Sequence, residues 1–128
     1  MGWLDDAIVT TKEQREEESK QRLIDIIESQ RKKAEDDGVT IKDVRYGGDK
    51  DNRQYLSEAV QTAKAEDKET FDYWKDSNGK FIKDHPVSEV ENAITEINKR
   101  RLDLISKEGE YVAQVETGDL TDADNLEW

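Results

Sequence analysis

The chain has 128 residues, with 32 Asp and Glu against 20 Lys and Arg, so its formal net charge is −12. Charged residues make up 41% and apolar residues 33%, which is close to the composition at which a chain no longer buries enough apolar surface to fold alone. This balance excludes a large enzyme core with a deep pocket. It also argues against nucleic-acid binding, because an acidic surface repels phosphate.

No apolar run reaches the length of a membrane span, and the first ten residues have neither the cationic start nor the apolar stretch of a signal peptide. Cysteine is absent and His85 is the single histidine. Disulfides, thiolate metal sites, cysteine nucleophiles and paired-histidine metal sites are therefore excluded. We expect no cofactor, no catalytic residue and no metal site, and hence a protein that is not an enzyme.

The N-terminal third predicts one long charged helix. Residues 1–9 form a small apolar segment, and Thr10 or Thr11 can cap a helix that we expect over 11–36. Between 12 and 22 there is no apolar side chain, but opposite charges recur at helical spacing, which is typical of a helix solvated on all sides. An apolar stripe follows at Leu23, Ile24 and Ile27.

The middle of the chain predicts short strands and a second helix. Residues 39–46 alternate and are rich in β-branched side chains, which favours one short strand. A glycine turn then leads to a helix over 52–66, capped by Asp51 or Asn52, with an apolar stripe at Leu56, Ala59, Val60 and Ala63. Asn78-Gly79 between aromatic residues predicts a β-hairpin of 70–75 and 80–83 with a type I′ turn.

The last third predicts another long helix, which starts near Val87 with Pro86 suited to its first turn. It breaks near Gly109 or continues to Gly118, and Leu126 and Trp128 then fasten the final segment to the core. The helix carries a heptad-like stripe of Val87, Val90, Ile94, Ile97, Arg101 and Leu104, with Arg101 as the polar exception.

These elements predict an α+β fold that is mostly helical: a long charged N-terminal helix, then a small domain of helices with a short β-hairpin. We expect two parts, a helical arm over 1–38 for attachment or oligomerisation and a small α+β domain over 39–128. Aromatic residues around the hairpin are expected to supply much of the core of the small domain.

Four candidate chemical sites each have a plainer interpretation. Asp76 to Gly79 resembles part of a calcium loop, but the loop spacing would place Trp74 and His85 at ligand positions, so a turn is favoured. His85 beside Asp84 is a candidate acid–base pair, although a single histidine before proline in a loop is more often a surface residue. Gly47-Gly48 lacks the spacing of a phosphate-binding loop, and no spacing selects a carboxylate pair for hydrolysis.

The apolar segment at the N-terminus has a different meaning. It precedes a solvated helix and has no apolar neighbour in sequence to pack on, so we predict that it contacts a partner or another copy of the chain. Folding back onto the domain is the alternative. The predicted contact residues are Trp3, Leu4, Ile8 and Val9, with Leu23, Ile24 and Ile27 nearer the domain and Val90, Ile94 and Ile97 on the heptad stripe.

From about residue 40 to 128 the order of signals resembles a domain of unknown function that recurs in proteins of tailed bacteriophages, often encoded near tail-fibre and baseplate genes. The resemblance rests on Arg45-Tyr46, on the segment from Trp74 to Gly79 and on the terminal Trp128. The helices of that family are usually alanine-rich, whereas those of this chain are rich in charge. The resemblance implies a virion or tail-assembly role and carries over no catalytic residue.

We therefore expect a bacteriophage structural or adaptor protein of the tail, tail fibre or neck, located in the virion after assembly in the host cytoplasm. It would act through contacts with other tail proteins, as a homo-oligomer with coiled-coil character and a trimer favoured, without nucleic-acid or membrane partners. A tail-fibre assembly chaperone that is absent from the finished virion is one alternative. A small hydrolase or calcium-binding module is another.

Overall fold

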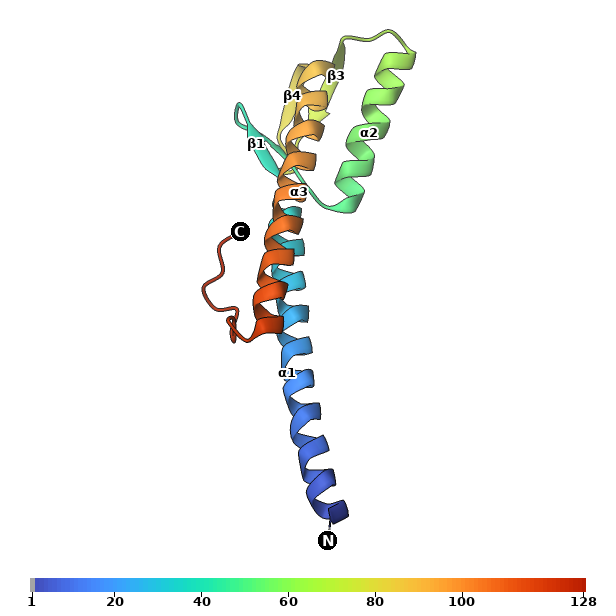
Figure 1. Ribbon diagram of the computed structural model, residues 1–128. Coiled ribbons are helices and arrows are strands. Elements are labelled where there is room, and N and C mark those ends of the chain that lie inside the picture. The colour runs from blue at the N-terminus through green and yellow to red at the C-terminus, as the bar shows by residue number, and fades with distance from the viewer. Residues whose placement is uncertain (1) are drawn as a thin grey trace. The chain divides into compact units, whose positions relative to one another are not determined.

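The computed structural model describes the backbone of residues 2–128 and the side chains of residues 11–128. It contains three helices and two small antiparallel sheets, which confirms the predicted, mostly helical α+β class (Figure 1). Contacts divide the chain into two compact units. The first unit joins residues up to Arg31 with Ser106–Trp128, and the second is Lys32–Ile105. The predicted division into 1–38 and 39–128 stays a prediction.

Helix α1 spans Gly2–Asp36, so it begins nine residues before the predicted start. Each further residue of a formed helix adds a hydrogen bond, and propagation therefore continues through the threonines expected to act as caps. Every described side chain from 11 to 19 is exposed, which confirms the solvated helix. Helix α1 ends at Asp36, as predicted, and Gly38, with a φ of +65°, follows it.

Residues 39–46 form two strands, β1 (Val39–Ile41) and β2 (Val44–Tyr46), where the sequence predicted one. Lys42 and Asp43 both have positive φ, 50° and 68°, which is the geometry of a two-residue type I′ turn. The prediction was wrong because neither residue carries the Asn-Gly signal of such a turn.

Helix α2 (Lys50–Ala65) is capped by Asp49, two residues before the first predicted cap. The Asp49 carboxylate accepts the amide of Asn52 and also contacts the Asn52 side chain, and these hydrogen bonds lower the pKa of Asp49. The predicted apolar stripe of this helix is confirmed, because Leu56, Val60 and Ala63 are buried.

Strands β3 (Thr70–Lys75) and β4 (Phe81–Pro86) form the predicted hairpin, with Lys75 opposite Phe81. The type I′ turn was wrong: the loop has five residues, and within it only Gly79 has a positive φ. The carboxylate of Asp76 accepts the amides of Asn78 and Lys80, at 3.0 and 2.8 Å, and thereby closes this wider loop. Pro86 ends β4 and does not enter the helix.

Helix α3 (Val87–Thr117) continues through Gly109, and Gly118 follows it with a φ of +82°. Its first half packs in the core of the second unit with residues of β2, α2 and β3. Trp74 is buried in this core, as expected of the hairpin aromatics, but Tyr73 and Phe81 are both 65% exposed. The core residues of this unit are Val44, Tyr46, Leu56, Val60, Ala63, Trp74, Val87, Val90, Ala93 and Ile97.

The first unit has its own small core. Ile27 of α1 packs with Val115 of α3 and with Ala123 of the C-terminal segment. The Trp128 ring meets Tyr111 edge-on at 5.1 Å, and its indole N–H donates to Gln30 at 3.0 Å. This confirms that the end of the chain is fastened by Trp128 and, through partial burial in the same core, by Leu126.

Candidate functional site

The predicted contact residues of α1 fall into two groups. Trp3, Leu4, Ile8 and Val9 lie outside the residues whose side chains the structure describes. Leu23 and Ile24 are partly buried and Ile27 is fully buried, all three in the core of the first unit. The second group therefore has a packing partner within the chain, and Ile27 offers no surface to another protein in this conformation.

The heptad stripe of α3 is also used within the chain. Val90 and Ile97 are buried in the core of the second unit, and Ile94 is partly buried against it. The polar exception, Arg101, is explained by a buried carboxylate: Glu35 of α1 accepts Arg101 Nε at 2.7 Å and Arg53 Nη1 at 2.5 Å. Arg101 thus has an ion pair where the heptad pattern would place an apolar contact.

His85 is buried with 2% of its surface exposed, so the expectation of a surface residue was wrong. Asp84 has a φ of 53°, which breaks the alternation of β4 so that Ile82 and His85, three residues apart, are the more buried positions. His85 Nε2 lies 2.6 Å from the Tyr46 hydroxyl, and Nδ1 lies 3.7 Å from a Glu89 oxygen. These two contacts of His85 are with Tyr46 and Glu89, and not with Asp84, the acid–base partner predicted from the sequence.

The protonation states in this cluster follow from burial. Desolvation lowers the pKa of His85, although Glu89 opposes the shift, and it raises the pKa of Tyr46 to about 12, with Glu89 and Asp76 adding to the rise. His85 Nδ1 faces the Glu89 carboxylate, which favours the tautomer with its proton on Nδ1, and in that tautomer Nε2 accepts the Tyr46 hydroxyl. The contact between Tyr46 and His85 ties β2 to β4, and the nearby cavity beside Tyr46 and Trp74, which His85 does not line, measures about 40 Å³.

The calcium interpretation is likewise answered by geometry. The buried Asp76 carboxylate accepts backbone amides of Arg45, Asn78 and Lys80. Burial raises the pKa of Asp76, but these hydrogen bonds outweigh it and hold the pKa below its usual value. Across the described residues, no group of three or more acidic or histidine side chains is arranged to hold a metal ion. The turn that was favoured over a calcium loop is confirmed.

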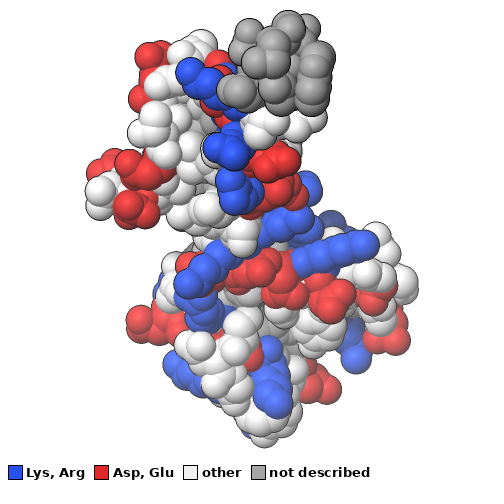
Figure 2. Space-filling model, turned by 90° about the horizontal axis from the view of Figure 1, so that it is seen from below, with Lys and Arg blue, Asp and Glu red and all other residues white. Residues whose placement is uncertain are grey.

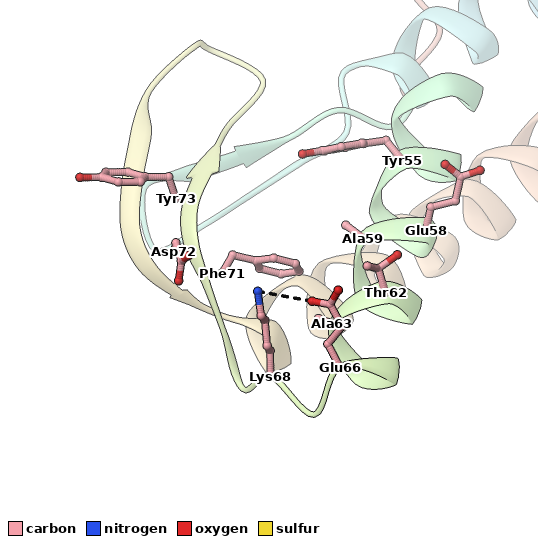
Figure 3. Close-up of a pocket in the computed structure, with 10 residues that line it drawn as sticks. All are labelled: Tyr55, Glu58, Ala59, Thr62, Ala63, Glu66, Lys68, Phe71, Asp72 and Tyr73. Carbon is pink, nitrogen blue, oxygen red and sulfur yellow. Dashed lines mark ion pairs between the residues drawn. The ribbon is translucent and has the colours of Figure 1, made fainter.

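No sequence pattern indicated a concave site that the structure shows in the second unit, a groove of about 390 Å³ between α2 and β3. Figure 3 shows Tyr55 and Phe71 directed into the space between these elements, with Ala59 and Ala63 on α2 beneath and Tyr73 directed away from α2. We call this site the α2–β3 groove. The Trp74 ring supports its wall, with ring centroids 5.4 Å from Tyr55 and 5.0 Å from Phe71.

Three carboxylates, Glu58, Glu66 and Asp72, lie among the residues that line the α2–β3 groove, against one cation, Lys68. Lys68 is paired with Glu66 at 3.4 Å (Figure 3). Elsewhere the two signs of charge are mixed, as Figure 2 shows for one face of the molecule. The groove therefore combines aromatic and aliphatic walls with an acidic rim.

A second concave site belongs to the first unit. It has a volume of about 410 Å³ and lies between α1 residues such as Leu23 and Ile26 and the C-terminal segment around Ala123. Ile26 is 50% exposed.

None of the helices, over the residues that the structure describes, has the apolar length that a membrane span requires.

The comparisons with known proteins agree with the resemblance seen in the sequence. No curated protein and no solved structure matches the chain. A family model, however, matches residues 18–127, which extends the resemblance from about residue 40 back into α1. Because this match covers most of the chain, the protein belongs to the family described as the domain of unknown function DUF4376.

Proposed function

We propose that the protein is a non-catalytic structural or adaptor protein of a bacteriophage virion, in the tail, tail-fibre or neck region. One observation supports contact-based function above all: the described side chains from Thr11 to Ser19 are exposed around the whole circumference of α1. A helix of this kind bridges between partners and does not build a core. The phage assignment itself rests on the family resemblance.

The partner contact in this proposal lies at the N-terminal end of the chain. Leu23, Ile24 and Ile27 already pack against α3 and the C-terminal segment. Of the contact residues predicted at this end of the chain, those at positions 3–9, ahead of the solvated part of α1, are the ones we assign to another protein. Other tail proteins would bind there, or further copies of the chain would, with a trimer favoured.

Sedimentation of the full chain tests the self-association. We expect a trimer, with three times the 14.8 kDa of one chain, and we expect Trp3→Asp with Ile8→Asp to give monomers. The matched control is Lys12→Asp with Arg15→Asp, which adds negative charge to the same helix at exposed positions and should leave the trimer intact. Ile27→Asp is unsuitable, because a carboxylate there would enter a core. A trimer that survives the first double substitution would contradict this contact.

Mass spectrometry of purified particles tests the virion role. The phage whose genome encodes the chain is grown, and its particles are separated on a density gradient. An adaptor is found in the particles at a fixed ratio to the tail proteins. A protein that is required for infectious particles but absent from them is an assembly chaperone, the second candidate, and that outcome would overturn the structural role.

A further inference from the structure

The α2–β3 groove lies along a free strand edge. In the part of the chain that the structure describes, β3 pairs with β4 alone. The groove is lined by residues of β3, of α2 and of the turn that joins them, with none from β4, so it follows the edge of β3 that has no strand partner. Figure 3 shows β3 between β4 and α2. Unpaired N–H and C=O groups at such an edge accept an added strand.

The other outer edge of the hairpin is less suited to strand addition. Asp84 in β4 has a positive φ, and such irregularities interrupt the pairing of an edge. All residues of β3 have negative φ. The positive φ that interrupts β4 is therefore absent from β3, the strand beside the groove.

The size and charge of the groove specify what fits there. The lining residues extend from Tyr55 of α2 to Glu66, its C-cap, a helical length of about 16 Å, which corresponds to about five residues of extended chain. Ala59 and Phe71 offer apolar contact area to alternate side chains of such a strand. Glu58 and Asp72 offer carboxylates, and neither makes an ion pair with the one lysine of the groove, which contacts Glu66. A basic strand complements this rim.

We propose that the α2–β3 groove binds an extended segment of another protein in which apolar and basic side chains alternate, and that this segment adds to β3 as a third strand. The inference deepens the proposed function, since it rests on the chain acting through protein contacts. It assigns a second contact surface, in the second unit, separate from the N-terminal end of α1. Virion location and peptide binding are measured independently, so either can fail without the other.

The test is titration of the ¹⁵N-labelled full chain with the synthetic peptide Lys-Val-Lys-Val-Lys-Val-Lys. We expect shifts of backbone amides in β3 and along α2. Glu-Val-Glu-Val-Glu-Val-Glu should give none. A basic peptide N-methylated at alternate residues keeps its charge and loses strand hydrogen bonds, so it should bind at least about tenfold more weakly, which corresponds to about 1.4 kcal/mol.

Variants locate the site. Ala59→Trp fills the groove and should weaken binding at least about tenfold. Gln61→Trp is the matched control, because Gln61 is exposed on α2 outside the groove lining. Glu58→Gln with Asp72→Asn should weaken binding about fivefold, as expected for exposed ion pairs. The amide spectrum of each variant without peptide establishes that it is folded.

Several outcomes would overturn the proposal. They are equal binding of the acidic and basic peptides, shifts confined to other elements, equal weakening by Ala59→Trp and Gln61→Trp, or full affinity of the N-methylated peptide. Absence of any shift at millimolar peptide would do so as well. If the amides of β3 move when the unlabelled chain is added instead of peptide, a second copy occupies the groove and the proposed partner is wrong.

Discussion

The backbone just after α1 lies directly against the backbone just after β2, and we call this contact the crossing. The crossing depends on glycine at positions 38 and 48. A Cβ atom at Gly38 would lie 1.9 Å from the Tyr46 carbonyl oxygen and 2.7 Å from the Gly48 nitrogen. Gly38 also has a φ of +65°, and the Gly48 amide donates to the Asp36 carbonyl at 3.2 Å in the same crossing. A methyl group at position 38 therefore cannot be accommodated unless the backbone moves.

We expect Gly38→Ala to destabilise the second unit by about 1.5–3.5 kcal/mol. The left-handed conformation costs alanine about 1–2 kcal/mol. Displacement of the backbone breaks the Gly48–Asp36 hydrogen bond, worth about 0.5–1.5 kcal/mol. Gly109→Ala is the matched control: Gly109 lies inside α3, and a Cβ there meets nothing within 4 Å. This change should stabilise the first unit by about 0.5–1 kcal/mol, because glycine is the poorer helix former.

Urea titration followed by the indole N–H signals of Trp74 and Trp128 distinguishes the two units, because each ring is packed in a different one. Gly38→Ala should lower the urea midpoint of the Trp74 signal, and Gly109→Ala should raise that of Trp128. If Gly38→Ala leaves the free energy of unfolding within about 0.5 kcal/mol of the parent chain, the size of an ordinary surface substitution, the argument from the crossing is refuted.

Two further predictions concern buried polar groups. Glu35→Gln removes the charge shared by Arg53 and Arg101 and should destabilise the second unit by about 1–3 kcal/mol, less than a fully buried pair because both arginines are partly exposed. Urea unfolding measures this, and an unchanged midpoint would contradict it. His85 has a lowered pKa when folded, so the unfolded chain binds more protons and stability should fall as the pH drops below about 6.5. His85→Asn should remove this dependence of the unfolding free energy on pH between pH 7 and 5.5. A dependence that persists in the variant would show that other groups cause it.

Periodicity predicted the helices of this fold well, because apolar spacing reports which face is buried. The stripes of α2 and α3 both appear in the core of the second unit. Turn geometry was less accessible. Asn78-Gly79 carries the sequence signal of a type I′ turn, yet Lys42-Asp43 adopts that geometry and the Asn78 loop does not. Hydrogen bonds to Asp76 decide the shape of that loop, and these depend on tertiary burial of its carboxylate.

The candidate sites also depend partly on local sequence patterns, which could be predicted, and partly on contacts between distant residues, which could not. Arg101 was visible in sequence as an exception in a stripe, but its partner Glu35 lies 66 residues away and no local pattern connects them. His85 was predicted to be a surface residue of a loop. It is buried because Asp84 before it has a positive φ, and nothing in the Asp-His-Pro sequence indicates that backbone conformation. The α2–β3 groove forms only when a helix and a strand edge lie side by side, so its lining residues have no shared spacing in the chain.

The polar residues of this acidic chain fall into two kinds. Three buried polar side chains, Glu35, Asp76 and His85, each bridge elements that are distant in sequence. Burial of a polar group without a hydrogen-bond partner is costly, so each of these three bonded side chains favours one arrangement of the second unit over others. The charges of α1 from 11 to 19 are exposed and join no core. These three buried polar contacts all lie in the second unit, whereas the solvated part of α1 follows an apolar N-terminal sequence, which is where we place the first of the two proposed partner contacts.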